Sequence, residues 1–221
     1  MEKKWFVALL MVVVMMCACW TGAVADEERK TFTSGDYQYA LLDDGTVEIA
    51  GYKGSADLLA IPAELDGKAV TSIGDCAFYL CSSLTSVSIP DSVEQIGTNP
   101  FAACFELKTI SVSPEHPYFA TIDGVLFRKA DKALISYPAS ISSSTYTIPQ
   151  GITSIGDSAF FYCDSLTSVS IPDSVTSIGD YAFAGCGSLT LTVPRNSYAA
   201  EYAKANNIPY TYPDANDWLN N

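Results

Sequence analysis

Apolar residues return at a fixed interval along much of this chain. Residues Ile152–Phe160 read ITSIGDSAF, and 23 residues later Val175–Phe183 reads VTSIGDYAF; the same pattern stands earlier, at Val70–Phe78. A fixed period of about 20–29 residues is typical of a solenoid, in which each unit stacks on the one before it. The pattern therefore predicts a solenoid, and it specifies this scaffold much more strongly than it specifies a ligand.

Each unit carries two short apolar segments. In Ser86–Ile89 polar and apolar residues alternate, which is the period-two pattern of a half-buried strand. Residues Val70–Ile73 form a second short extended segment that Gly74 ends, and Phe78 is expected to point inward from a tight turn. Because one unit has too few apolar groups to fold alone, we expect neighbouring units to stack about 4.8 Å apart and bury a continuous core.

The standard 23-residue unit occurs four times, with one interruption. Copies begin at Val70, Val93, Ile152 and Val175. In the second copy the surface residues drift while the apolar positions stay in register, as a stacked core requires. Residues 116–151 replace one standard unit with a longer variant that predicts a hairpin around Asp123-Gly124. We expect this variant unit to be structural, with binding as the alternative, since insertions in solenoids often project and bind.

The repeat resembles the BspA-like, or treponemal-type, branch of leucine-rich repeat proteins. Residues Leu166–Cys186 match its unit, LTSVxIPxSVTSIGxxAFxxC, and the resemblance covers about residues 70–195. It implies a leucine-rich repeat solenoid of stacked short β-strands with irregular or short helical turns, an N-terminal β cap over residues 37–69 and a C-terminal helical cap and tail over residues 196–221. Members of this family are mostly secreted or surface-displayed, so the resemblance also implies export. Many members are proposed adhesins or host-protein binders, so it implies binding of a protein partner.

The two ends of the chain carry further signals. Two lysines, an apolar run over residues 5–16 and an Ala-Val-Ala site predict a signal peptide, residues 1–25. Lipoprotein processing at Cys19 is the alternative, although the residues before Cys19 fit it poorly. Residues 26–36 are polar and read as a flexible leader. At the other end, Ser197 is expected to N-cap a helix over residues 198–206 that covers the last repeat.

Charge and motifs narrow the function. Removing residues 1–25 takes away two lysines and one glutamate, so the formal net charge of −13 becomes −14. Such an acidic chain argues against binding nucleic acid or anionic membranes. No motif of a hydrolase, zinc protease, P-loop or dinucleotide site occurs, so we expect neither an enzyme nor a cofactor. The single histidine, His116, is expected at the surface, and the recurring Asp75, Asp157 and Asp180 are expected to cap turns.

Cysteine usage leaves two possibilities open. Five of the seven cysteines follow the signal peptide: Cys76, Cys81, Cys104, Cys163 and Cys186. Four of them share one repeat register, which favours a column of buried free thiols along the stack over disulfides. The fifth, Cys76, is expected either to pair with Cys81 or to stay free. A linear column does not supply the tetrahedral closure of a zinc site.

These observations predict a non-enzymatic, exported module that binds a protein partner. Its expected contact residues are Tyr79, Phe161, Tyr162 and Tyr181 in non-core repeat positions, and Ser86, Ser88, Ser168 and Ser170 on the outward face of the strands. Aromatic side chains are the better anchors, because a carpet of small hydroxyls lacks the residues typical of binding hot spots. A structural envelope component without a ligand and a carbohydrate-binding module are the alternatives.

Overall fold

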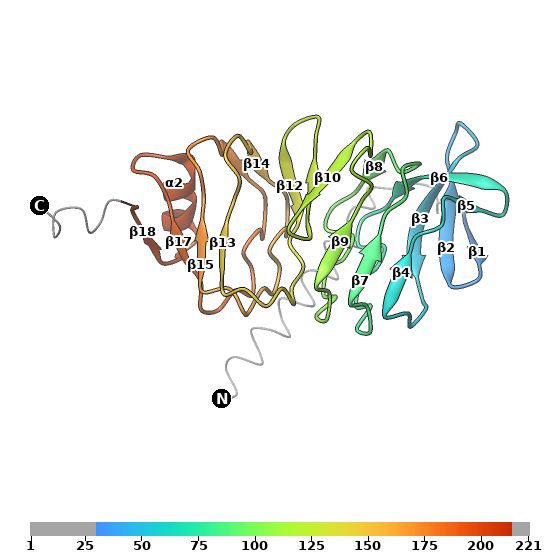
Figure 1. The fold of residues 1–221 in the computed structure, drawn as a ribbon, viewed down its shortest axis with the longest axis horizontal. Coiled ribbons are helices and arrows are strands. Elements are labelled where there is room, and N and C mark those ends of the chain that lie inside the picture. The colour runs from blue at the N-terminus through green and yellow to red at the C-terminus, as the bar shows by residue number, and fades with distance from the viewer. Residues whose placement is uncertain (1–29, 214–221) are drawn as a thin grey trace, which may run out of the picture.

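In a computed structural model, which describes residues 30–213, the chain forms an elongated β-solenoid (Figure 1). The predicted signal peptide and residues 214–221 lie outside the described residues. The expected leucine-rich repeat solenoid of stacked short strands is confirmed. Two ladders of parallel strands run along it, because the two apolar segments of each unit lie beside their counterparts in the next unit.

Each ladder consists of two separate runs. The first ladder contains β3 (Val47–Tyr52), β6 (Lys68–Ile73) and β8 (Gln95–Ile96), then β12 (Ala133–Ser136), β14 (Ser154–Ile155) and β16 (Ser177–Ile178). The second ladder contains β4 (Leu58–Ala60), β7 (Ser86–Ser88) and β9 (Thr109–Ser111), then β13 (Thr145–Thr147), β15 (Ser168–Ser170), β17 (Thr190–Thr192) and β18 (Tyr210–Thr211). Strands β8 and β12 do not pair, nor do β9 and β13. The molecule therefore has a first module (residues 30–115) and a second module (residues 116–213).

Both modules open with an antiparallel meander. In the first module, β1 (Thr31–Ser34) and β2 (Tyr37–Leu41) lead into β3, and β5 (Glu64–Leu65) later pairs with β6. In the second, β10 (Phe119–Ile122) and β11 (Val125–Arg128) lead into β12. The predicted hairpin is present: Asp123 and Gly124 have φ of 52° and 81°, as a tight two-residue turn with two positive φ angles requires.

The meander of the second module, β10–β12, contributes side chains to the hydrophobic cores of both modules. Its strands send Phe119, Leu126 and Ile135 into the core of the first module, while Val125 and Leu134 pack into the core of the second. Successive strand side chains point to opposite faces, so one thin layer serves both sides. The long variant unit is thus built into the stack as a structural element.

Aromatic rings form the centre of each core. The Phe78 and Phe101 rings stack with centroids 5.3 Å apart, and Phe160 lies between Tyr137 at 5.0 Å and Phe183 at 4.9 Å. All of these side chains are buried, which confirms the inward orientation expected at this register. Burying an aromatic side chain of this kind stabilises the fold by roughly 1.5–3 kcal/mol.

The cysteine column is confirmed. Cys81, Cys104 and Cys163 are buried free thiols, and Cys186 is a half-buried one. The Cys104 thiol donates to the carbonyl of Phe78 at 3.0 Å. The hydrogen bond with Cys81, together with burial, raises the pKa of Cys104 well above its ordinary value, so this thiol stays protonated. Cys81 is a free thiol and Cys76 is disulfide-bonded, so both expectations for Cys76, a bond with Cys81 and a free thiol, are wrong.

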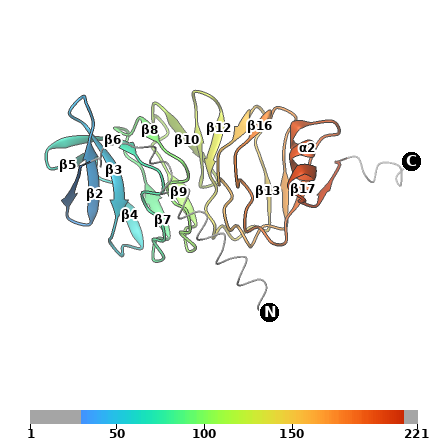
Figure 2. The same ribbon diagram turned by 180° about the vertical axis from the view of Figure 1, so that it is seen from behind.

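The ends of the solenoid agree with the predicted caps and add one strand. Helix α2 (Tyr198–Ala205) begins after Ser197, whose side chain accepts from the Ala200 N–H, and ends one residue before the expected limit. Figure 2 shows α2 covering the C-terminal end and the β1–β3 meander at the opposite end. Residues 31–34, expected in a flexible leader, instead form β1, because its backbone pairs with β2 through a turn at Gly35, where φ is 56°.

Candidate functional site

The hydroxyl-bearing strand face is flat and falls in two parts. Ser86 and Ser88 lie on β7, and Ser168 and Ser170 lie on β15. Of these four residues Ser88 is exposed and the other three are half-buried. On one side of β7 the ladder neighbours are further small hydroxyl residues, such as Thr109 beside Ser86, but on the other side Ser86 lies beside Leu58, which is 69 % exposed. This face therefore offers mainly hydrogen-bonding groups, with the exposed Leu58 side chain at one end.

An aromatic cluster lies on the turn side of the solenoid, where the two modules meet. We call Tyr79, Phe105 and Tyr162 the junction cluster. The ring centroids of Phe105 and Tyr162 are 5.9 Å apart, edge to face. Burial and, to a smaller extent, the nearby Tyr162 hydroxyl raise the pKa of Tyr79, although Tyr79 forms no ring contact with Phe105 or Tyr162. Phe105 and Tyr162, which are 57 positions apart in the chain, thus meet at one surface.

The cluster presents apolar surface to solvent mainly at Phe105, because Tyr79 and Tyr162 are half-buried. Phe105 is 45 % exposed, and Leu80, next to Tyr79 in the chain, is 47 % exposed. Phe161 is only 8 % exposed and packs under Tyr162 with ring centroids 4.6 Å apart, so it supports the cluster and presents little surface of its own. Its expected role as an outward anchor is therefore corrected by its burial.

The backbone of the repeat fixes the position of Tyr162. The turn residue at this position of the repeat has a positive φ in every standard unit, between 55° and 83°; these residues are Leu80, Ala103, Tyr162 and Gly185. Only at Gly185 is this conformation free of steric cost. A Cβ on Gly185 would lie 2.7 Å from Cγ of Tyr162, so the glycine lets the tyrosine ring lie against the backbone of the next coil. Tyr162 is held between Gly185 on one side and Phe105 on the other.

Two members of this surface differ from the sequence expectation. Tyr181 is 53 % exposed and, like Tyr79, makes no ring contact with another aromatic side chain in residues 30–213. Phe105 was not predicted. The signal was present, because the equivalent position after the repeat cysteine is Ser82, Asp164 or Gly187 in the other copies. An aromatic side chain at an otherwise polar or small position marks a surface that the core does not need.

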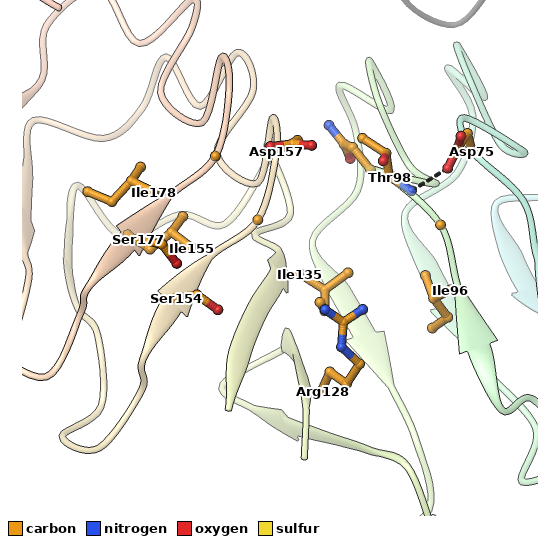
Figure 3. Close-up of a pocket in the computed structure, with 14 residues that line it drawn as sticks. Asp75, Ile96, Thr98, Arg128, Ile135, Ser154, Ile155, Asp157, Ser177 and Ile178 are labelled. Carbon is orange, nitrogen blue, oxygen red and sulfur yellow. Dashed lines mark hydrogen bonds between the residues drawn. The ribbon is translucent and has the colours of Figure 1, made fainter. Parts of the chain in front are cut away.

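A groove of about 410 Å³ opens on the first ladder at the same junction (Figure 3). Its walls come from β8 and the loop after it on one side and from β14 and β16 on the other, and Arg128 lies between them. The Arg128 guanidinium binds both carboxylate oxygens of Asp131, at 2.9 and 2.7 Å. At depth, the buried Asn99 side chain donates to the carbonyl of Ser158 at 2.8 Å and ties the modules together.

Two of the three recurring aspartates lie at the groove, and their carboxylates bond to the next coil rather than to their own turns as expected. The Asp75 carboxylate accepts from the Thr98 N–H at 2.6 Å, and Asp157 accepts from the Asp180 N–H at 2.8 Å. Each carboxylate thus caps the following coil of the stack. Within residues 30–213 no group of three His, Cys, Asp or Glu side chains is placed to hold a metal ion.

The single histidine has a structural role. His116 is 0 % exposed, which corrects the expected surface position. Its Nδ1 accepts from the N–H groups of Tyr118 and Phe119, both at 3.2 Å, and its Nε2 lies 3.1 Å from the carbonyl of Pro90. Burial lowers the pKa of His116, so the neutral ring is favoured. The ring closes the turn that starts the second module.

The comparisons with known proteins agree with this architecture. Residues 64–143 and 135–205 match the family described as BspA type Leucine rich repeat region, in six copies. No protein with a curated description matches the chain. In the part of the chain that the structure describes, no helix is long and apolar enough to span a membrane.

Solved structures of similar proteins come from several bacteria. The Treponema pallidum leucine-rich repeat protein is 27 % identical, with 75 % of this chain and 72 % of that one covered and a TM-score of 0.46. A leucine-rich cell surface protein of Faecalibacterium prausnitzii is 23 % identical, covering 76 % and 77 %, with a TM-score of 0.42. The pneumococcal vaccine antigen PcpA is 17 % identical, covering 78 % and 72 %, with a TM-score of 0.50, and shares the fold. With the family matched over more than half of its length, the chain belongs to the BspA-type leucine-rich repeat family.

Proposed function

We propose that this protein is an exported, non-enzymatic module that binds a partner protein through the junction cluster. Leucine-rich repeat domains generally mediate protein interactions, and the fold supplies a rigid stack on which side chains from distant coils are held in place. The observation that carries the proposal is the cluster itself. Exposed aromatic side chains beside apolar ones are the residues that anchor protein interfaces.

Three features of the junction cluster support this role. The rings of Phe105 and Tyr162 are held by each other, and that of Tyr162 also by the backbone of Gly185, so these two side chains lose little entropy on binding. Tyrosine combines a large apolar face with a hydroxyl that can bond at the rim. The cluster also spans both modules, so a partner seated on it would contact the solenoid where its regular repeat is interrupted.

Export is supported by the sequence of residues 1–25, with its basic start, apolar run and Ala-Val-Ala site. The free thiols of the cysteine column are compatible with a reducing or an oxidising compartment, because buried thiols are poorly accessible to oxidants. We propose cleavage after Ala25 and a cell-surface or secreted location. Processing at Cys19 would instead leave the same domain attached to a membrane by a lipid.

The test is a capture experiment with residues 26–221 as bait against secreted and cell-surface protein fractions and glycans. The test variant combines Tyr79→Ser, Phe105→Ser and Tyr162→Ser. The matched control combines Tyr198→Ser and Tyr210→Ser, two exposed tyrosines at the far end of the molecule. Circular dichroism and the urea midpoint verify that both variants are folded.

We expect a protein that the parent and the control capture and that the cluster variant loses. Capture by all three proteins would place binding on another surface and refute the role of the cluster. Capture of a glycan alone would favour the carbohydrate-binding alternative. Absence of any partner for the folded parent would contradict the proposal and favour a structural envelope role.

A further inference from the structure

Strand β8 is the point at which the first ladder ends without a successor. In complete coils, strand carbonyls accept from the next coil: Ile73 O from Gly97 N at 2.8 Å, and Ile155 O from Gly179 N at 2.9 Å. The equivalent carbonyl on β8 is that of Ile96. Within residues 30–213, β8 pairs only with β6, and no backbone donor of a following strand reaches Ile96 O. The outer edge of β8 is therefore an unused half of a strand ladder.

The neighbouring positions repeat the same situation. Thr71 O accepts from Glu94 N at 2.8 Å, but the equivalent Glu94 O has no such partner in the described chain. Beyond the strand, Ser158 N donates to Asp180 O at 2.9 Å, whereas the equivalent N–H of Asn99 has no acceptor there. Two acceptors and one donor are thus presented along one edge. This is the arrangement to which an added strand bonds.

The groove lies directly along this edge. Its apolar lining is made by Ile96, Ile135, Ile155 and Ile178, and Ile96 belongs to β8 itself. Figure 3 shows Ile96 on one wall and Ser154 with Ile155 on the other. A volume of about 410 Å³ is within the ~300–1,000 Å³ of typical ligand sites. The space is therefore large enough to accept backbone and short side chains, and the four isoleucines at its floor, each 2–7 % exposed, leave only a small apolar surface to cover.

The charge at the rim selects the ligand. Arg128 is neutralised by its two bonds to Asp131. Asp75 and Asp157 each use one oxygen, Oδ1, to cap the next coil and form no salt bridge within the described residues. Both carboxylates are exposed at the same end of the groove, as Figure 3 shows for Asp75 and Asp157 beside Thr98. The groove accordingly combines an apolar floor with an acidic end.

We propose that this groove binds an extended peptide segment of a partner protein that carries lysine or arginine and adds a strand to β8. The N–H groups of the peptide donate to the carbonyls of Glu94 and Ile96, and a peptide carbonyl accepts from the N–H of Asn99. Its apolar side chains cover the isoleucines, and its basic side chain pairs with Asp75 or Asp157. This site is distinct from the junction cluster, on the strand side of the same junction.

The experiment begins with a displayed library of random linear peptides, selected on the folded 26–221 chain. Ser177→Trp, at an exposed residue lining the groove, serves for counter-selection because its indole fills the space. Enriched peptides are then synthesised in three forms: unmodified, with lysine and arginine replaced by glutamine, and with N-methylated backbone amides. N-methylation removes the N–H donors while the charge and side chains stay the same.

A second set of variants tests the acidic end. Asp75→Asn with Asp157→Asn keeps an oxygen that accepts from the backbone N–H groups, so the caps are retained. Asp91→Asn with Asp173→Asn is the matched control, because it removes the same charge at exposed positions outside the groove. We expect peptide affinity to fall roughly threefold to tenfold in the groove variant and to be unchanged in the control.

The proposal predicts enriched peptides that are basic, lose binding on N-methylation and bind the Ser177→Trp variant at least about tenfold more weakly. Two results would overturn it. The first is that no peptide distinguishes the parent from the folded Ser177→Trp and Asp75→Asn, Asp157→Asn variants. The second is that the enriched peptides bind equally well after N-methylation or after loss of their basic residues. Neither result bears on the junction cluster, which the capture experiment tests separately.

Discussion

Phe160 shows how a single repeat position holds the stack together. It is fully buried between the rings of Tyr137 and Phe183. We predict that Phe160→Ala lowers the free energy of unfolding by about 3–5 kcal/mol, because it removes buried apolar surface and leaves a cavity that the stacked rings cannot fill. Urea unfolding of parent and variant measures the difference. A loss below about 1 kcal/mol would contradict the central place of this ring.

His116 makes stability depend on pH. Burial lowers the pKa of the folded ring below its unfolded value of about 6.5, so the folded state favours the neutral form. Its contribution is present above pH ~6.5 and is lost as pH falls through the folded pKa, with a slope of at most about 1.4 kcal/mol per pH unit. In His116→Gln this dependence between pH 7 and pH 5 should disappear.

The two proteins are compared by urea unfolding at several pH values in that range. Carboxylates with lowered pKa values, such as Asp131 beside Arg128, act below about pH 4 and do not overlap with this window. Identical curves for parent and variant would mean that another group is responsible.

For individual residues, the sequence predicts the burial of those that recur in every repeat, but not of a residue that occurs only once. Phe78, Phe160 and the cysteine column follow from register, because every copy places the same side chain at the same depth. His116 occurs once, in a loop between repeats, and no period indicates that two backbone N–H groups point at its ring. Its burial depends on contacts across 26 residues, with Pro90, that spacing alone does not reveal.

At the scale of elements, helix α2 seals the C-terminal end of the core. Ala199, Ala200 and Ala203 are its buried face, and Ser197 accepts from the Ala200 N–H at 3.2 Å. We predict that Ser197→Ala costs about 1 kcal/mol, because the first turn loses its cap, and that Ser197→Asp recovers most of it. Thermal or urea unfolding measures both variants. Equal stability of the parent and the alanine variant would contradict the capping role.

Elements with a strong apolar pattern were predictable, and those held by a neighbour were not. The ladders and α2 follow from alternation and from helical spacing. Strand β1 contains one large apolar residue, Phe32, and its backbone is ordered by pairing with β2, so its polar composition resembles that of a leader. The second meander was predictable as strands, but not as a wall with Leu126 in one core and Leu134 in the other.

At the scale of the whole molecule, the junction between modules is the main departure from a uniform repeat. Asn99 crosses it, with its buried amide donating to the carbonyl of Ser158. We predict that Asn99→Ala lowers the free energy of unfolding by about 1–3 kcal/mol, because that carbonyl loses its partner in a buried position. The secondary structure should be unchanged by circular dichroism. A neutral effect on the urea midpoint would show that the amide does not hold the modules together.

The junction also explains why the candidate sites were only partly predictable. The repeat identified Tyr79 and Tyr162 as side chains that the core does not need, but 83 residues separate them. The position of Tyr162 beside Phe105 depends on how the variant unit fits between the modules. The groove arises for the same reason, since β8 has no successor in its ladder. The sequence period predicts only the repeated positions. The junction cluster and the groove both lie where the regular repeat is interrupted, so the period does not predict them.

The most direct measurement is the equilibrium dissociation constant for the captured partner with the parent, the junction-cluster variant and the Tyr198→Ser, Tyr210→Ser control. We predict that loss of the three aromatic side chains weakens binding by at least about 2 kcal/mol, roughly thirtyfold, as expected for hot-spot residues. The control should bind like the parent. Equal affinity of all three folded proteins would contradict the claim that the junction cluster is the binding surface.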